Sequence, residues 1–262
     1  MPLARRRLAG RQARELAFAA LILLYALLTI GVLVYPSPVL SIDQWWLDRH
    51  LWGAHPQYHW FVYHYVMLGQ RGPTTIVFLP VVAYLAWRRR TSAPVVMFVT
   101  SLLLLNVSVA VVKYFVGRVG PRDQNDVHVV FTSGTLFPSG HLSNTVVVYG
   151  VLAMLMPRFR RLIVTAVVFL CLTVGLGTIY LRTHWFSDVV GGWIAGALVL
   201  LALPDLMPHV QPRVDAAVAA ADARWGQKWR HKWGHRWPRR ADAPAPPPAA
   251  ESADQENATP VS

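Results

Sequence analysis

Six apolar runs constrain this chain more than any other feature of its sequence. They cover residues 16–34, 72–87, 94–112, 141–156, 162–181 and 185–203, with polar or basic stretches between them. A helix that crosses a bilayer needs about 20 mainly apolar residues. Valine is common in these runs, but their length and their lack of period-2 alternation favour helices over strands. We therefore expect an all-α polytopic membrane bundle with six transmembrane helices.

The composition also indicates a membrane protein. Of 262 residues, 54% are hydrophobic and only 15% are charged, which is unusual for a soluble domain of this size. The net charge of +12 would also suit a nucleic-acid-binding protein. However, the basic residues fall in short bursts between the apolar runs, and this pattern is typical of membrane topology. We therefore expect the bilayer as the partner and expect no nucleic acid.

The distribution of Lys and Arg predicts the orientation. Six spans place both termini on one side, together with the basic N-terminus, the basic stretches 88–90 and 158–161 and the basic C-terminal tail. By the positive-inside rule this side is the cytoplasm, so the loops 35–71, 113–138 and 182–184 face outward. A signal peptide is the alternative for the first run, but the run is long and no small-residue cleavage site follows it. We expect a multi-pass protein of the cytoplasmic membrane.

The predicted organisation has four parts. A basic cytoplasmic N-terminus covers 1–15, a six-helix membrane domain covers 16–204, a cytoplasmic basic Trp-rich segment covers 205–240, and a tail rich in Ala and Pro covers 241–262. In the third part, tryptophans recur every four residues between basic residues, at Trp225, Trp229, Trp233 and Trp237. This spacing suits a helix that lies against anionic lipids of the inner leaflet, with nucleic-acid binding as the alternative. The composition of the fourth part predicts disorder.

Two histidines and one aspartate are the first candidates for chemistry. His184 and Asp188 are four residues apart, so they share a face if the segment is helical. A carboxylate bonded to one imidazole nitrogen fixes the tautomer and makes the other nitrogen a better nucleophile. The alternative is a purely structural hydrogen bond. His141 opens the fourth run, where a second imidazole could protonate a leaving oxygen or could simply be a polar residue at the membrane interface.

Three further residues suit phosphate binding. Ser139 and Gly140 precede the fourth run, where backbone N–H groups and the positive end of a helix favour an anion; the alternative is that Ser139 only caps the helix. Lys113 ends the third run, where the alternative is a lysine that reaches for lipid headgroups. The orientation derived from charge places all the candidate residues on the outer face. We therefore expect a single site there for phosphoryl transfer without a metal.

Together these motifs resemble the type 2 phosphatidic acid phosphatase superfamily, which includes lipid phosphatases, acid phosphatases and vanadium haloperoxidases. The family pattern is Lys, six residues, Arg-Pro; then Pro-Ser-Gly-His; then Ser-Arg, five residues, His, three residues, Asp. Lys113, the run 138–141, His184 and Asp188 match it. The resemblance implies that His184 is a nucleophile forming a phosphohistidine, that Asp188 orients His184, and that His141 protonates the leaving group. It also implies that Lys113 and the Ser-Gly pair bind phosphate, with no metal or cofactor.

Two positions depart from this pattern. The first motif has Gly120 where the family has arginine, and the third motif has Thr178 at its arginine position. Arg118 and Arg122 flank the first gap, and Arg182 lies one helical turn beyond the second. We expect Arg118 and Arg182 to replace the missing guanidinium groups, because a phosphate held by lysine alone is poorly neutralised. The alternative is a weakened or degenerate site.

The expected function is hydrolysis of a membrane lipid phosphate or diphosphate at the outer face. The resemblance suggests polyprenyl diphosphate, phosphatidate and phosphatidylglycerol phosphate as substrates. A lipid-linked phosphotransferase and a non-catalytic lipid-binding protein are the alternatives. Histidines in the loop 50–64 could in principle bind a metal, since His55 and His59 have helical ligand spacing. The tryptophans between them favour instead an aromatic segment at the membrane interface, so no metal site is expected.

Overall fold

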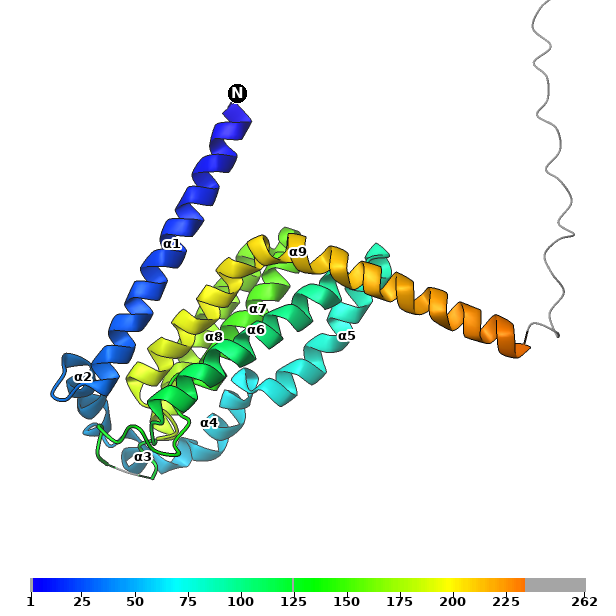
Figure 1. The fold of residues 1–262 in the computed structure, drawn as a ribbon. Coiled ribbons are helices and arrows are strands. Elements are labelled where there is room, and N and C mark those ends of the chain that lie inside the picture. The colour runs from blue at the N-terminus through cyan, green and yellow to red at the C-terminus, as the bar shows by residue number, and fades with distance from the viewer. Residues whose placement is uncertain (1, 124, 234–262) are drawn as a thin grey trace, which may run out of the picture. The chain divides into compact units, whose positions relative to one another are not determined.

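The computed structural model describes residues 2–123 and 125–233, and every regular element within these ranges is helical. In chain order the elements are α1 (Pro2–Leu33), α2 (Pro38–Leu47), α3 (Leu51–Ala54), η1 (Pro56–Tyr58), α4 (His59–Val66), η2 (Met67–Gly69), α5 (Arg71–Arg89), α6 (Ala93–Val116), α7 (Gly140–Leu155), η3 (Pro157–Phe159), α8 (Arg160–Tyr180) and α9 (Phe186–Trp233) (Figure 1). The η elements are single 3₁₀ turns. The all-α prediction is confirmed for this part of the chain.

The helices that could span a membrane coincide with the apolar runs. In the described residues four segments are long and apolar enough, Gly10–Leu33, Ala93–Val116, Pro157–Tyr180 and Phe186–Trp225. A fifth is possible if Pro56–Gly69 and α5 form one span, although they are bent by 50° at their junction. Helix α7 is apolar but has only 16 residues. The protein is therefore a helical membrane protein with four or five candidate spans, and a sixth span stays a prediction.

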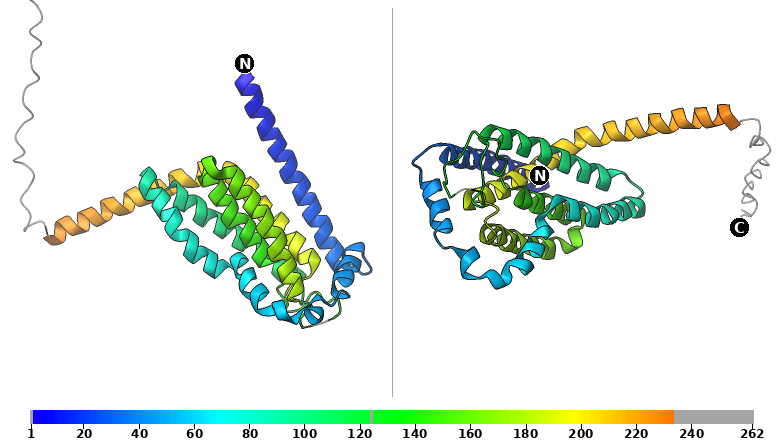
Figure 2. Two further views of the ribbon diagram at one scale, coloured as in Figure 1. Left: turned by 180° about the vertical axis from the view of Figure 1, so that it is seen from behind. Right: turned by 90° about the horizontal axis from the view of Figure 1, so that it is seen from below.

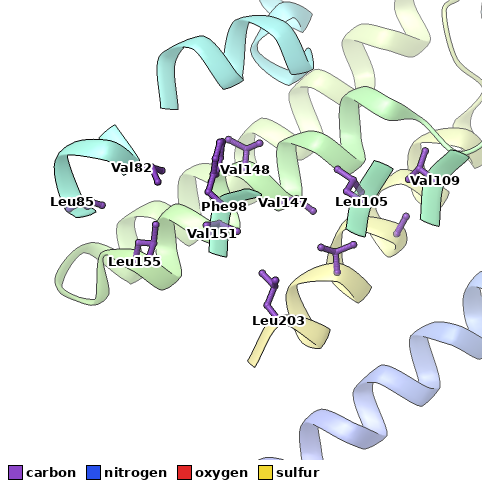
Figure 3. Packing of buried hydrophobic residues seen from close by; sticks show 12 residues of the cluster. Val82, Leu85, Phe98, Leu105, Val109, Val147, Val148, Val151, Leu155 and Leu203 are labelled. Carbon is purple, nitrogen blue, oxygen red and sulfur yellow. The ribbon is translucent and has the colours of Figure 1, made fainter. Parts of the chain in front are cut away.

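Helix α7 lies at the centre of the packed bundle. It contacts α5, α6 and α8, and these helices run side by side with the first part of α9 (Figures 1 and 2). The largest buried cluster joins Val147 and Val151 of α7 to Leu105 of α6 and Leu203 of α9, each of them 0% exposed (Figure 3). In a membrane such packing stabilises mainly through van der Waals contact, because lipid is as apolar as leucine.

Small residues bring α9 close to α7. A Cβ on Gly192 would lie 2.7 Å from the carbonyl oxygen of Ser139, and a Cβ on Gly196 would lie 2.6 Å from the Cβ of Val146. Any larger side chain would therefore push the two helices apart. The glycines matter for the site because the start of α9 carries the third motif and the start of α7 carries the second.

The last helix does not end at Leu203, where the apolar run ends. It continues to Trp233 through Pro204, Pro208 and Pro212. Contacts divide the chain into one compact unit that ends at Asp215 and a second that begins at Ala216. Trp237 and the predicted tail 241–262 lie outside the described residues, as do the side chains beyond Trp225, so the predicted lipid-binding stripe stays a prediction.

The aromatic segment between α1 and α5 packs on itself. His59 stacks on Trp52 with ring centroids 3.5 Å apart, and its Nε2 lies 3.0 Å from the Trp52 carbonyl oxygen. His64 Nδ1 lies 2.7 Å from the carbonyl oxygen of Trp60. Within the described ranges, no three His, Cys, Asp or Glu side chains come close enough together to hold a metal ion. These histidines therefore have aromatic and backbone partners.

Candidate active site

The three motifs meet at one end of the bundle. Lys113 lies in the last turn of α6, and Gly117 caps the end of this helix. Gly117 has φ +55°, and a Cβ there would lie 2.4 Å from the Thr132 carbonyl oxygen, so glycine is needed for the chain to turn back toward α7. Gly140 begins α7, and His184 stands two residues before α9. Local helix ends thus place all three motifs together.

The two motif histidines face each other. The rings of His141 and His184 have centroids 5.8 Å apart in an edge-on arrangement. His184 is 5% exposed, and its Nδ1 lies 3.4 Å from Oδ2 of Asp188, which also accepts from the Trp185 N–H at 3.0 Å. This contact favours the tautomer with a proton on Nδ1, leaving the Nε2 lone pair available. A nucleophile and a second imidazole therefore lie within reach of one substrate.

The start of α7 offers donors to an anion. The Ser139 N–H already donates to the Asp188 carbonyl oxygen at 2.9 Å, and the Ser139 Oγ accepts from Leu142 N at 3.5 Å as a helix cap. The hydroxyl hydrogen of Ser139 takes part in neither of these two bonds and can donate to an anion. Apart from its chain neighbours and the backbone of its own helix turn, no described atom lies within 4 Å of a Cβ built on Gly140, so there is open space at a helix N-terminus. Lys113 Nζ donates to the Thr135 carbonyl oxygen.

A buried charge network stands behind the histidines. Arg118 is 0% exposed, and its Nη1 donates to Asp188 Oδ1 at 2.9 Å and to Ser187 Oγ at 2.7 Å. Its Nη2 donates to Asp43 Oδ2 at 2.7 Å and to the Val127 carbonyl oxygen at 3.1 Å. Arg118 therefore holds the carboxylate that contacts His184. Its Nε–H has no acceptor among the described residues.

Asp43 completes this network and was not expected from the motifs. It lies on α2, is 1% exposed, and accepts from the Ser187 N–H at 2.8 Å and from the Ser187 Oγ at 2.6 Å. Burial raises the pKa of the Asp43 carboxyl above its ordinary value, although the Arg118 guanidinium opposes this rise. In the sequence, Asp43 stands out only as the one acid in the aromatic and apolar run 42–47. That pattern does not reveal its partner Arg118, which is 75 residues away.

Arg182 lies near His184 but has protein partners. Its Nη2 donates to the Pro121 carbonyl oxygen at 2.6 Å and to Asn125 Oδ1 at 2.5 Å. With His184 and Asp43 it lines a cavity of about 180 Å³ whose walls include several aromatic side chains. Thr178, which occupies the motif arginine position, is buried, and its hydroxyl donates to the Gly175 carbonyl oxygen. Phosphate binding by Arg118 and Arg182 stays a prediction.

The three motifs also do not predict Arg71, which is the first residue of α5. The segment that carries it is bonded to α7, because Asn144 Nδ2 donates to the Gly69 carbonyl oxygen at 3.0 Å and to Thr74 Oγ1 at 2.9 Å. The sequence signal was a cation directly before the second apolar run, at the end opposite to the basic triplet 88–90.

Comparison with known protein families finds a match for the segment that carries the three motifs. A family model for the PAP2 superfamily matches residues 94–211, a range that contains all three motifs. Residues 94–211 of the chain belong to the PAP2 superfamily. Family membership supports phosphatase chemistry for this PAP2 protein, and its apolar helices place it in the membrane branch.

One solved structure shares the fold of this PAP2 protein. It is described as the first transmembrane PAP2-type phosphatidylglycerolphosphate phosphatase from Bacillus subtilis. The two chains are 22% identical, with a TM-score of 0.59, and the match covers 74% of this chain and 96% of the other. At this identity the likeness concerns the fold. No protein of curated function matches the sequence.

Proposed function

We propose that this PAP2 protein is a membrane phosphatase that hydrolyses a lipid phosphate or diphosphate through a phosphohistidine on His184. The observation that carries the proposal is the arrangement of His184 between the Asp188 carboxylate, 3.4 Å from Nδ1, and the His141 ring, whose centroid is 5.8 Å away. The solved structure with the same fold is a phosphatidylglycerolphosphate phosphatase, which agrees with lipid phosphate chemistry.

The proposed reaction has two displacement steps. In the first, the Nε2 lone pair of His184 attacks phosphorus, the bond from phosphorus to the lipid oxygen breaks, and protonated His141 gives its proton to that oxygen. In the second, His141 takes a proton from water as the water oxygen attacks the phosphohistidine. The bond from phosphorus to Nε2 then breaks and phosphate leaves. Asp188 stabilises the positive charge that His184 carries in between.

The phosphate oxygens need donors throughout both steps. We propose Lys113, the Ser139 hydroxyl and the Gly140 N–H for this role, because they gather at the open start of α7. Arg118 and Arg182 remain proposed phosphate-binding residues through the Nε–H groups for which the described residues offer no acceptor. Arg118 has a further proposed role as a positioning residue, since it holds Asp188.

The proposed topology has six spans, cytoplasmic termini and an outward-facing site. The six spans are the four long helices, the bent pair that includes α5, and α7. Helix α6 has Lys113 near its C-terminal end, while the basic triplet 88–90 precedes its N-terminal end. A helix of 24 residues is about 36 Å long at 1.5 Å per residue, which supports a site and a basic triplet on opposite sides of the apolar layer. We also propose that the basic Trp segment binds anionic lipids.

Phosphate release by the purified protein tests the function. The panel is polyprenyl diphosphate, phosphatidate and phosphatidylglycerol phosphate in mixed micelles, each with and without an acceptor alcohol. Release of inorganic phosphate from at least one lipid supports the phosphatase. Transfer to the alcohol in preference to water would indicate a phosphotransferase, and lipid binding without turnover would indicate a non-catalytic protein.

A further inference from the structure

We propose that Arg71 binds the substrate phosphate and supplies the guanidinium that the motifs lack at Gly120 and Thr178. This inference rests on the proposed function, because it assigns one more residue to the same site. Arg71 belongs to none of the three motifs and precedes the first of them by 42 residues. Its assignment comes from its position, its charge and its lack of other partners.

The backbone of Arg71 is fixed against the start of α7. A Cβ on Gly69 would lie 2.8 Å from Thr145 Oγ1 and 3.0 Å from the carbonyl oxygen of His141, so the chain two residues before Arg71 touches the turn that carries the second motif. The Asn144 amide donates to the chain on both sides of Arg71, at Gly69 O and Thr74 Oγ1. The junction of η2 and α5, where the chain bends by 50°, thus sits beside the active site.

The positive charge of Arg71 acts on Lys113, the proposed phosphate-binding lysine. Arg71 and Lys113 are close enough for their charges to repel each other, and Lys113 in turn interacts with the charges of Asp188 and His141. Two cations that repel each other stabilise a dianion that lies between them. A phosphate monoester or the terminal phosphate of a diphosphate carries that charge.

Among the described residues, Arg71 also has more unbonded N–H groups than Arg118 or Arg182. Its side chain is exposed, and among the described residues it has no hydrogen-bond or ion-pair partner; only its carbonyl oxygen is engaged, by Thr74 Oγ1 at 3.1 Å. Both Nη groups of Arg118 already donate hydrogen bonds to protein acceptors, and Arg182 Nη2 donates to two acceptors. A bidentate contact needs two parallel N–H groups on one guanidinium, and Arg71 can provide them.

The test compares the full-length wild type with Arg71→Ala, Arg71→Gln and Arg71→Lys in mixed micelles. Arg88→Ala is the matched control, because Arg88 is exposed on the same helix at the opposite end. The readouts are kcat/KM for phosphatidate and for a polyprenyl diphosphate, and the inhibition constant of vanadate. Removing one donor to a transition-state charge costs about 100- to 1,000-fold, and we expect the lower end, about 100-fold, because Arg71 is exposed to solvent.

The expected result is that Arg71→Ala and Arg71→Gln lower kcat/KM by this factor and weaken vanadate inhibition in parallel. Arg71→Lys should recover part of the loss, and Arg88→Ala should match the wild type. If folded Arg71→Ala and Arg71→Gln stay within about 3-fold of the wild type in both readouts, the inference is wrong. If the wild type releases no phosphate from any lipid, the proposed function fails instead. Vanadate binding measured by calorimetry then tests whether Arg71 binds phosphate. Weaker binding to Arg71→Ala than to the wild type supports this role, and equal binding overturns it.

Discussion

Replacing Arg118 by methionine should strongly destabilise the protein. The change leaves two carboxylates without their cation, at Asp43 and Asp188, which are 1% and 0% exposed. Removing one partner of a buried ion pair costs about 3–5 kcal/mol, because the remaining charge stays desolvated. Methionine fills much of the arginine volume, so the lost charge, more than a cavity, determines the cost.

A comparison with Asp43→Asn separates charge from packing. In that variant Arg118 keeps its bond to Asp188, and the amide oxygen can still accept from the Ser187 N–H. The expected cost is about 1–3 kcal/mol, the usual cost of an impaired buried hydrogen bond. Adding Asp43→Asn to Arg118→Met removes one of the two unpaired charges, so the double variant should be more stable than the sum of the single costs predicts.

Thermal unfolding in detergent, followed by tryptophan fluorescence, measures the relative stabilities of these variants. One kcal/mol shifts the midpoint of a protein of this size by about 2–4 °C, so Arg118→Met should lower it by about 6–20 °C. Asp43→Asn should lower it by less. A midpoint for Arg118→Met equal to that of the wild type, or above that of Asp43→Asn, would refute the account of a charge network that depends on Arg118.

Three further predictions concern pH, metal and Arg182. Because burial raises the pKa of Asp43, the folded state keeps the carboxyl proton to higher pH than the unfolded state. The stability that this carboxyl contributes is therefore present at low pH and falls as pH rises from about 4 through the raised pKa. The difference in unfolding midpoint between wild type and Asp43→Asn should narrow over that range. Turnover should survive EDTA and be inhibited by vanadate, and restoration by added metal after chelation would contradict the histidine mechanism. Arg182→Ala should lower kcat/KM by about 100- to 1,000-fold if its Nε–H contacts phosphate in the transition state, whereas a change of only a few-fold would limit Arg182 to holding the 121–125 loop.

The sequence predicts the helices well because their signals are local. Apolar runs of bilayer length, closed by basic residues or glycine, set most helix ends, and the motif residues stand at those ends. The helices α2, α3 and α4 are exceptions, because they lie in the segment 35–71 that the sequence predicts as a loop. Helix α9 is another, since the apolar pattern stops at Leu203 while the helix runs on to Trp233. Its three prolines would be expected to interrupt a helix, but the alanine-rich stretch 216–223 that follows favours one.

The partners of the site residues were harder to predict because they come from distant segments. Its place beside Gly120 predicts Arg118 as a phosphate ligand, but the sequence does not reveal its bonds to Asp43, 75 residues away, and to Asp188. Arg71 lies outside every motif, and contacts of Gly69 and Asn144 hold its backbone beside the start of α7. Sequence spacing predicts which residues share a helix face, whereas these pairings depend on how separate helices pack.

Trapping of the phosphoenzyme tests the phosphohistidine mechanism without relying on kinetics. The wild type would be mixed with a lipid phosphate labelled at phosphorus, quenched at alkaline pH within one turnover, and mapped by mass spectrometry. We expect label on His184 and its accumulation when the second step is slowed. In His184→Ala we expect a folded protein with no label and no turnover. Turnover by the wild type without label on His184, or near-normal turnover by His184→Ala, would contradict this mechanism.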